Sequence, residues 1–186
     1  GLGDVYKRQE FKEHSGNYDS QSFLQTPEMA KLLEKRGYDV RYLGYRVENK
    51  LEIISLSYIM PVTGGFQMKI DSGPVHSNSK YLKQFYKALQ GYAKSNGVLE
   101  LIVEPYDDYQ LFTSSGVPSN QGNDNLIEDF TSSGYHHDGL TTGFTGKYLS
   151  WHYVKNLEGV TSETLLSSFS KTGRALVKNC LLYTSD

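Results

Sequence analysis

Residues 77–105 read SNSKYLKQFYKALQGYAKSNGVLELIVEP and decide the fold, because they predict a helix followed directly by a strand. Asn78 or Ser79 can cap the start of the helix, and Gly97 ends it. Apolar residues line one side of the helix, namely Leu82, Phe85, Leu89 and Tyr92 or Ala93. Residues 98–105 then form a short apolar run, which is typical of a buried strand.

A second helix is expected earlier in the chain, in the segment SFLQTPEMAKLLEKRGY at residues 22–38. Thr26 is a suitable N-cap, Pro27 fits the first helical position, and Gly37 stands where a C-terminal cap belongs. Its apolar stripe consists of Met29, Leu32 and Leu33.

Between these helices the apolar pattern changes to a period of two. Residues 39–62 predict a β-hairpin with its turn at Glu48–Lys50. The alternating positions are Val40, Tyr42, Gly44, Leu51, Ile53 and Ser55. A second turn at Gly64–Gly65 leads into a strand at residues 66–75.

The remaining segments complete a mixed pattern. Residues 106–123 are polar and predict a loop, and residues 124–135 predict a short helix. Residues 140–157 read as extended segments, and residues 160–179 as a helix capped by Thr161. The order of elements predicts a mixed α/β fold with a mostly antiparallel front end and one helical crossover.

Composition excludes several classes of protein. The net charge of −2 argues against a dedicated nucleic-acid-binding domain, so any contact with a polyanion must be local. The single cysteine, Cys180, excludes an internal disulfide, and no apolar run approaches the ~18 residues of a membrane span. A cytoplasmic protein is therefore expected. Residues 1–9 and 180–186 resemble translated vector sequence, so we expect a non-native leader and tail there.

Common catalytic and metal motifs are missing from the sequence. It holds no phosphate-binding loop, no Cys-x-x-Cys pair, no His-Glu-x-x-His and no Gly-x-Ser-x-Gly elbow. His136 and His137 are adjacent and would face opposite sides of a strand, so no metal site is expected from them.

Acids and tyrosines gather just beyond the strand at residues 98–105, at the end where α/β sheets commonly bind ligands. They are Glu104, Asp107, Asp108, Tyr106 and Tyr109. The acids could act as bases or as partners of an amine, with the tyrosines as walls. The alternative is a solvated turn that begins at Pro105, and residue types alone leave both open.

The segment SFSKTGRALVKN at residues 168–179 carries cations without acids. Lys171, Arg174 and Lys178 follow spacings of three and four, which place them on one helix face. A solvated face near a helix C-terminus explains part of this pattern. Contact with a phosphate explains all of it.

Four segments resemble, in order and spacing, the Fem/Mur family of peptidoglycan aminoacyltransferases. They are SFLQTPEMAKLLEKRGY, KIDSGPV, LIVEPYDDY and SWHYVKNLEGVTSETLLSSFSKTGRALVKN. The matching family motifs are a Q-(S/T)-x-x-(W/M)-A helix start, strands ending in GP and in D/E-P, and an S-K-x-G-R-x-x-V-K helix. The resemblance covers residues 22–179 and implies the acyl-CoA N-acyltransferase fold, with a nearly complete domain at residues 10–149 and the start of a second at 150–179.

The resemblance also implies an activity, which is transfer of an amino acid from aminoacyl-tRNA to the side-chain amine of a peptidoglycan stem peptide. The implied partners are aminoacyl-tRNA, as co-substrate, and a lipid-linked or nucleotide-linked muropeptide, with peripheral contact at the inner face of the membrane. No metal or organic cofactor is implied.

Site residues follow from the same resemblance, as substrate-binding positions with the catalytic residues unassigned. They are Lys35, Tyr38, Tyr106, Tyr109, Lys171, Arg174 and Lys178. Leu33 is the alternative to Lys35 at the basic position of the motif.

Two other functions stay open. An acetyl-CoA-dependent N-acetyltransferase would need a (Q/R)-x-x-G-x-(G/A) turn, and SKTGRA has the wrong order. A non-catalytic module that binds cell-wall precursors is the other. We expect residues 1–186 alone to be inactive and to expose apolar side chains around Trp151, Tyr153 and Val154.

Overall fold

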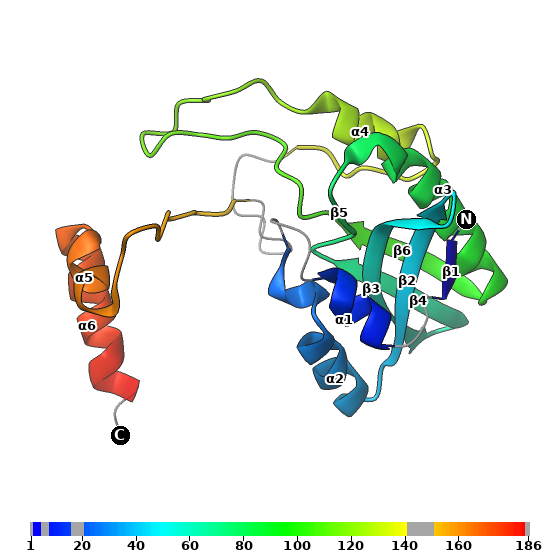
Figure 1. Ribbon diagram of the computed structural model, residues 1–186, viewed down its shortest axis with the longest axis horizontal. Helices are drawn as coiled ribbons and strands as arrows, with labels where there is room; N and C mark the ends of the chain where they lie inside the picture. The colour runs from blue at the N-terminus through cyan, green and yellow to red at the C-terminus, as the bar shows by residue number, and fades with distance from the viewer. Residues whose placement is uncertain (1, 5–7, 16–20, 141–150, 185–186) are drawn as a thin grey trace. The chain divides into compact units, whose positions relative to one another are not determined.

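The computed structural model describes residues 2–4, 8–15, 21–140 and 151–184. The chain forms two compact units, Gly1–Asp138 and Gly139–Asp186. In the described residues the first unit contains a sheet with helices on both faces, and the second contains helices (Figure 1). The division falls at residue 138, whereas the sequence places a domain boundary at residue 149.

The first unit is built on a six-stranded mixed sheet. Its strands are β1 Leu2–Asp4, β2 Asp39–Val47, β3 Lys50–Val62, β4 Gly65–Asp71, β5 Val75–His76 and β6 Val98–Glu104. The order is β1-β2-β3-β4-β6, and β5 pairs with β3 beyond the point where β4 stops pairing. All described pairs are antiparallel except β4 with β6. The predicted mixed α/β fold with one parallel crossover is confirmed.

The predicted hairpin forms between β2 and β3. Glu48 and Asn49 make its turn with φ values of 49° and 66°, the left-handed conformation that a two-residue hairpin loop requires. The register shifts between Tyr45 and Arg46, which leaves an extra residue on β3. This bulge puts Leu51 and Ile53 into different cores, so the period of two predicted across them is wrong there.

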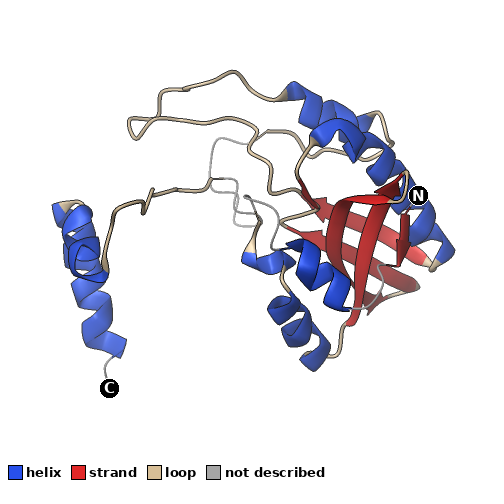
Figure 2. Ribbon diagram, viewed as in Figure 1, coloured by secondary structure: helices blue, strands red, loops and turns tan. Residues whose placement is uncertain are grey.

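Helices cover both faces of the sheet (Figure 2). On one face lie α1 Arg8–Ser15 and α2 Pro27–Lys35, and on the other lie α3 Leu82–Ser95 and α4 Asp124–Thr131. The predicted cap of α2 is confirmed, because Thr26 Oγ1 accepts a hydrogen bond from the Met29 amide at 3.2 Å. Leu32, predicted in the apolar stripe of α2, is exposed, and the fully buried Ala30 takes that place.

Each face of the sheet has its own core. Under α3 and α4, Phe85, Tyr86 and Leu89 pack against Met68 and Ile70 of β4. Under α1 and α2 the buried cluster consists of Phe11, Ala30, Leu33, Leu51, Ile54, Leu56, Tyr58 and Val75. Burial of both faces fixes the register of β3 and β4, and with it the position of their ends.

The strand β6 is less buried than its apolar sequence predicts. It pairs with β4 alone among the described strands, and Leu99 is exposed. The apolar run therefore marks a strand with one covered face and not a fully buried strand. The helix α3 connects β4 to β6, as a parallel pair requires.

Strand β1 and the first two residues of helix α1 lie within residues 1–9, for which a non-native leader is predicted, and the rest of α1 lies in the predicted first domain. Residues 2–4 pair with β2, and Phe11 of α1 is fully buried. The non-native origin of residues 1–9 stays a prediction.

The second unit holds α5 Ser162–Leu165 and α6 Lys171–Thr184. Thr161 caps α5, as predicted, but one continuous helix over residues 160–179 is wrong. The chain leaves the helix at Phe169, and Ser170 Oγ accepts a hydrogen bond from the Gly173 amide at 3.1 Å, which starts α6.

The extended segment predicted at residues 140–157 falls partly outside the described residues, since 141–150 are not described. Residues 151–157 form no strand. Trp151, Tyr153 and Val154 are exposed, so the predicted exposure of apolar side chains is confirmed for these three residues.

Candidate functional site

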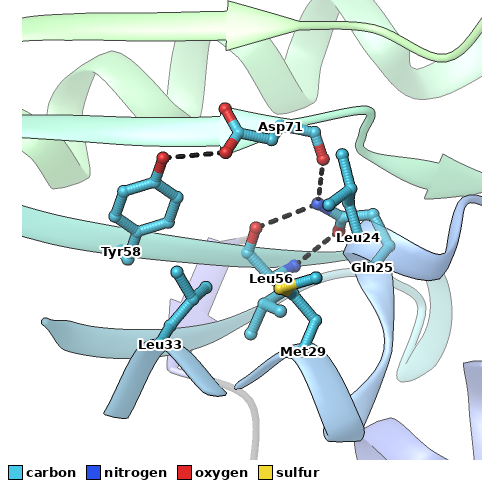
Figure 3. A pocket seen from close by; sticks show the side chains of 7 residues that line it. All are labelled: Leu24, Gln25, Met29, Leu33, Leu56, Tyr58 and Asp71. Carbon is cyan, nitrogen blue, oxygen red and sulfur yellow. Dashed lines mark hydrogen bonds between the residues drawn. The ribbon is translucent and has the colours of Figure 1, made fainter. Parts of the chain in front are cut away.

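A small pocket, here called the Asp71 pocket, lies where β4 ends, on the side of the sheet that carries α2 (Figure 3). It is lined by Leu24, Gln25, Met29, Leu33, Leu56, Tyr58 and Asp71. Its free volume is about 20 Å³, which admits about one water-sized group. Because most of the wall is apolar, the polar contacts available to a ligand come from Tyr58 and Asp71.

Tyr58 and Asp71 form a hydrogen-bonded pair in this pocket. The Tyr58 hydroxyl donates to Asp71 Oδ2 at 2.7 Å (Figure 3). Burial, and then this hydrogen bond, raise the pKa of Tyr58 above its ordinary value, so the hydroxyl stays a donor at neutral pH. The other carboxylate oxygen, Oδ1, accepts no hydrogen bond from the described residues.

A second carboxylate stands beside Asp71. Glu104 is its register partner on the parallel strand β6, so the two Cα atoms are about 4.8 Å apart and the side chains share a face. Burial, followed by the charge of Asp71, raises the pKa of Glu104, while Lys69 lowers it. Two adjacent carboxylates attract a cation, and the one with the raised pKa is the better proton acceptor.

A second small pocket, here called the His76 pocket, follows along the same strand ends. Pro74, His76, Tyr106 and Asp107 line its free volume of about 40 Å³. His76 Nε2 lies 3.0 Å and 3.2 Å from the two carboxylate oxygens of Asp107. In the described structure His76 Nδ1 is buried without a hydrogen-bond partner. The pair joins the end of β5 to the chain that leaves β6.

The sequence model of the FemAB family matches residues 6–181. The chain belongs to the FemAB family.

Curated relatives agree with this assignment. The chain is 29% identical over 165 residues to aminoacyltransferase FemB of Staphylococcus epidermidis, covering 87% of this chain and 40% of that protein. It is 26% identical over 166 residues to aminoacyltransferase FemA of the same species, covering 86% of this chain and 40% of the relative. The chain thus spans about two fifths of the length of these relatives.

The fold agrees with a solved structure of a FemX protein. The TM-score is 0.67 at 17% sequence identity, and the likeness covers 97% of this chain and 43% of that chain. The predicted mixed α/β fold class is confirmed, and the recognition of the Fem family is confirmed with it.

Two of the residues that the Fem resemblance selects lie at the end of α2. The ring of Tyr38 is 5.2 Å from the ring of Tyr58, which lines the Asp71 pocket, but Tyr38 itself lines neither pocket. Lys35 is the exposed last residue of α2 and lines neither pocket. Leu33, the alternative for the basic position, is buried in the pocket wall, and its apolar side chain cannot supply a basic contact.

The acids and tyrosines after β6 separate into two groups. Tyr106 and Asp107 line the His76 pocket, whereas Asp108 is exposed. Tyr109 donates its hydroxyl to Asp124 Oδ1 at 2.8 Å, at the start of α4, and lines neither pocket. A role for Tyr109 in substrate binding stays a prediction.

The predicted cations Lys171, Arg174 and Lys178 lie within the first eight residues of α6 and not in its last turn, where the helix-dipole explanation needs them. Arg174 Nη1 donates to the carbonyl oxygens of Ser167 and Phe169 at 3.2 Å and 2.7 Å. The guanidinium group of Arg174 therefore stabilises the turn before α6. Lys171 and Lys178 are exposed. Their contact with substrate stays a prediction.

Sequence reasoning missed Gln25, Tyr58, Asp71 and His76 as site residues. The rule that ligands bind at the carboxyl ends of strands was applied to β6 and applies equally to β4, which ends at Asp71. Tyr58 could not be found this way, because it lies inside β3 and reaches Asp71 only through the hairpin pairing.

No group of three or more His, Cys, Asp or Glu side chains in the described part of the chain is arranged to hold a metal ion. No helix among the described residues has the length and apolar character needed to cross a bilayer.

Proposed function

We propose that the protein to which this chain belongs transfers an amino acid from aminoacyl-tRNA to the stem-peptide side-chain amine of a peptidoglycan precursor, and so builds interpeptide bridges. Membership of the FemAB family, whose matched relatives are named aminoacyltransferases, sets the reaction class. The observation that carries the proposal within the structure is the pair of carboxylates, Asp71 and Glu104, at the ends of two parallel strands.

An amine acceptor suits this pair. A primary alkyl amine has a pKa near ~10.4, so it arrives as an ammonium ion and needs both a counter-charge and a proton acceptor before it can react. Asp71 supplies the charge, and Glu104, with its raised pKa, takes the proton. The amine nitrogen then attacks the ester carbonyl carbon of aminoacyl-tRNA. The new C–N bond forms as the ester C–O bond breaks, and the ribose oxygen leaves as a hydroxyl after taking the second proton that the amine nitrogen gives up.

The proposed partners follow from that reaction. They are aminoacyl-tRNA, a lipid-linked or nucleotide-linked muropeptide, and the inner face of the membrane where a lipid-linked precursor would be met. No cofactor is needed, because the ester bond of aminoacyl-tRNA already activates the carbonyl. The net charge of −2 means that tRNA contact would rest on local cations such as Lys171 and Lys178.

The test is a transfer assay on the complete protein encoded by the reading frame that contains residues 1–186. Labelled seryl-, alanyl- and glycyl-tRNA are supplied in turn with a nucleotide-linked pentapeptide that carries a lysine. We expect one of them to label the pentapeptide, and residues 1–186 alone to label none. Acetylation of the same acceptor from acetyl-CoA, without transfer from any tRNA, would overturn the proposal. Binding of the pentapeptide with no transfer would favour a binding module instead.

A further inference from the structure

The ladder of the sheet is interrupted on one edge of β3. Residues Tyr58–Val62 of β3 pair with β4, and Ile53–Ile54 pair with β5. Leu56 lies between these two ladders and has no strand partner on that edge. A buried backbone N–H and C=O without partners would be costly, so something other than a strand must satisfy them.

The side chain of Gln25 fills this gap. Gln25 Oε1 accepts a hydrogen bond from the Leu56 amide at 2.7 Å, and Nε2 donates to the Leu56 carbonyl at 3.1 Å. The same Nε2 donates to the backbone carbonyl of Asp71 at 2.8 Å. Figure 3 shows the amide between β3 and the end of β4. Gln25 is 1% exposed, so these bonds are shielded from water.

The backbone at Gly73 packs closely against the same side-chain amide of Gln25. A Cβ atom at this position would lie 2.6 Å from Gln25 Cδ and 2.8 Å from Nε2, closer than real Cβ contacts come. The Gly73 amide also donates to the Glu104 carbonyl at 3.0 Å, which ties the end of β4 to the end of β6. The three residues Gln25, Leu56 and Gly73 therefore form a tight support around Asp71, here called the Gln25 clasp.

The clasp acts on the residue that carries the proposed chemistry. It fixes the peptide of Asp71 from the β3 side, while Tyr58 fixes the carboxylate. Because both the backbone and the carboxylate of Asp71 are held by hydrogen bonds, the orientation of its other carboxylate oxygen, Oδ1, is fixed as well. Preorganisation of this kind determines rates, since a displacement of about 1 Å at a reacting group costs about a hundredfold.

We propose that Gln25 is a positioning residue for the amine site, whose side-chain amide replaces a strand between β3 and β4 and so orients the Asp71 carboxylate toward the acceptor amine. This inference rests on the proposed function and adds to it a residue that touches neither substrate. Gln25 acts through Asp71, and its substitution should affect the acceptor while sparing the aminoacyl-tRNA.

The first test uses Gln25→Ala and Gln25→Glu in the complete protein, with Gln84→Glu as a control that adds the same charge on an exposed position of α3. We expect kcat/KM for the pentapeptide acceptor to fall about tenfold to a hundredfold in both Gln25 variants, with KM for aminoacyl-tRNA unchanged. The Gln84 variant should behave as wild type. Amide exchange at Leu56 should become faster in Gln25→Ala, because its hydrogen-bond acceptor is gone.

The Gln25→Glu variant adds a pH readout. An ionised carboxylate cannot donate to the carbonyls of Leu56 and Asp71, but a protonated one restores a donor. The titratable groups that face this position are Tyr58 from β3 and Asp71 from β4, while α2 presents only Met29 and Leu33. We expect the activity of the variant relative to wild type to rise as the pH falls from 8 to 6, which a merely weakened fold would not produce.

The second test approaches the clasp from its other side. Gly73→Ala would push against the Gln25 amide, whereas Gly91→Ala on α3 meets nothing within 4 Å and serves as the matched control. We expect Gly73→Ala to lower kcat/KM for the acceptor as the Gln25 variants do. If folded Gln25 and Gly73 variants keep acceptor kinetics within twofold of wild type, or lose both substrates equally, the inference is overturned. A wild-type protein that transfers nothing would instead count against the proposed function itself.

Discussion

Phe11 provides a sharp test of whether α1 is part of the fold that supports the site. Its side chain is 0% exposed and packs edge-on against Tyr42 of β2, with ring centroids 5.2 Å apart. It belongs to the same buried cluster as Leu33 and Leu56, which line the Asp71 pocket. The substitution Phe11→Ala would leave a cavity beneath α1 and α2.

The cost follows from the buried position of the ring. A fully buried Phe replaced by Ala loses about 3–5 kcal/mol of unfolding free energy, from lost burial and from the cavity together. In a unit of this size each kcal/mol lowers Tm by about 4 °C, so Tm should fall by about 12–20 °C. Phe23→Ala is the matched control, because Phe23 is 70% exposed and its removal should cost less than about 0.5 kcal/mol.

The assay is urea unfolding followed by tyrosine fluorescence and by circular dichroism, with thermal scans of wild type and both variants. Coincident transitions by the two probes would justify a two-state treatment. If Phe11→Ala and Phe23→Ala have the same midpoint, α1 does not pack on the sheet, and the buried face described for α2 is wrong.

Two further predictions concern charge. Burial and the charge of Asp71 raise the pKa of Glu104, so the folded chain binds the Glu104 proton more tightly than the unfolded chain does. The contribution of Glu104 to stability is therefore lost as the pH rises from the unfolded value of about 4.5 through the higher folded pKa. The Glu104→Gln variant should therefore unfold at a higher urea concentration than wild type at pH 7 and at the same concentration near pH 3. The gain in unfolding free energy at pH 7 should be less than about 1 kcal/mol, because Glu104 is part-exposed. An equal gain at both pH values would contradict the raised pKa of Glu104 as its cause. Arg174→Ala should speed amide exchange in the first turn of α6 by about tenfold, because two carbonyl contacts are lost, whereas the exposed Lys178→Ala should not.

Much of the first unit was predictable, because helix caps and the spacing of apolar residues in the sequence agree with the folded structure there. Thr26, Pro27 and Gly37 define α2, and the apolar side of α3 faces the sheet as its spacing predicts. The failures have physical causes. A bulge beside Tyr45 shifts the apolar period, and within a segment that reads as one helix the chain leaves a helix at Phe169 and starts α6 at the Ser170 cap.

The site was only half predictable for a different reason. Asp107 and Tyr106 follow an apolar strand, and their place is visible in the sequence. The contacts of Gln25 with Leu56 and Asp71 join residues 31 and 46 positions apart. No local pattern encodes such contacts, since they depend on how β3, β4 and the helical turn Phe23–Gln25 before α2 meet in the folded chain.

The most direct test of the central claim is the transfer rate of the complete protein with Asp71→Asn. This change keeps the size of the side chain and removes its charge, while Asp138→Asn makes the same change at an exposed position outside both pockets. We predict that Asp71→Asn lowers transfer to the lysine-containing pentapeptide by about a hundredfold and that Asp138→Asn leaves it unchanged. Transfer by Asp71→Asn at the wild-type rate would show that the acceptor amine does not meet this carboxylate.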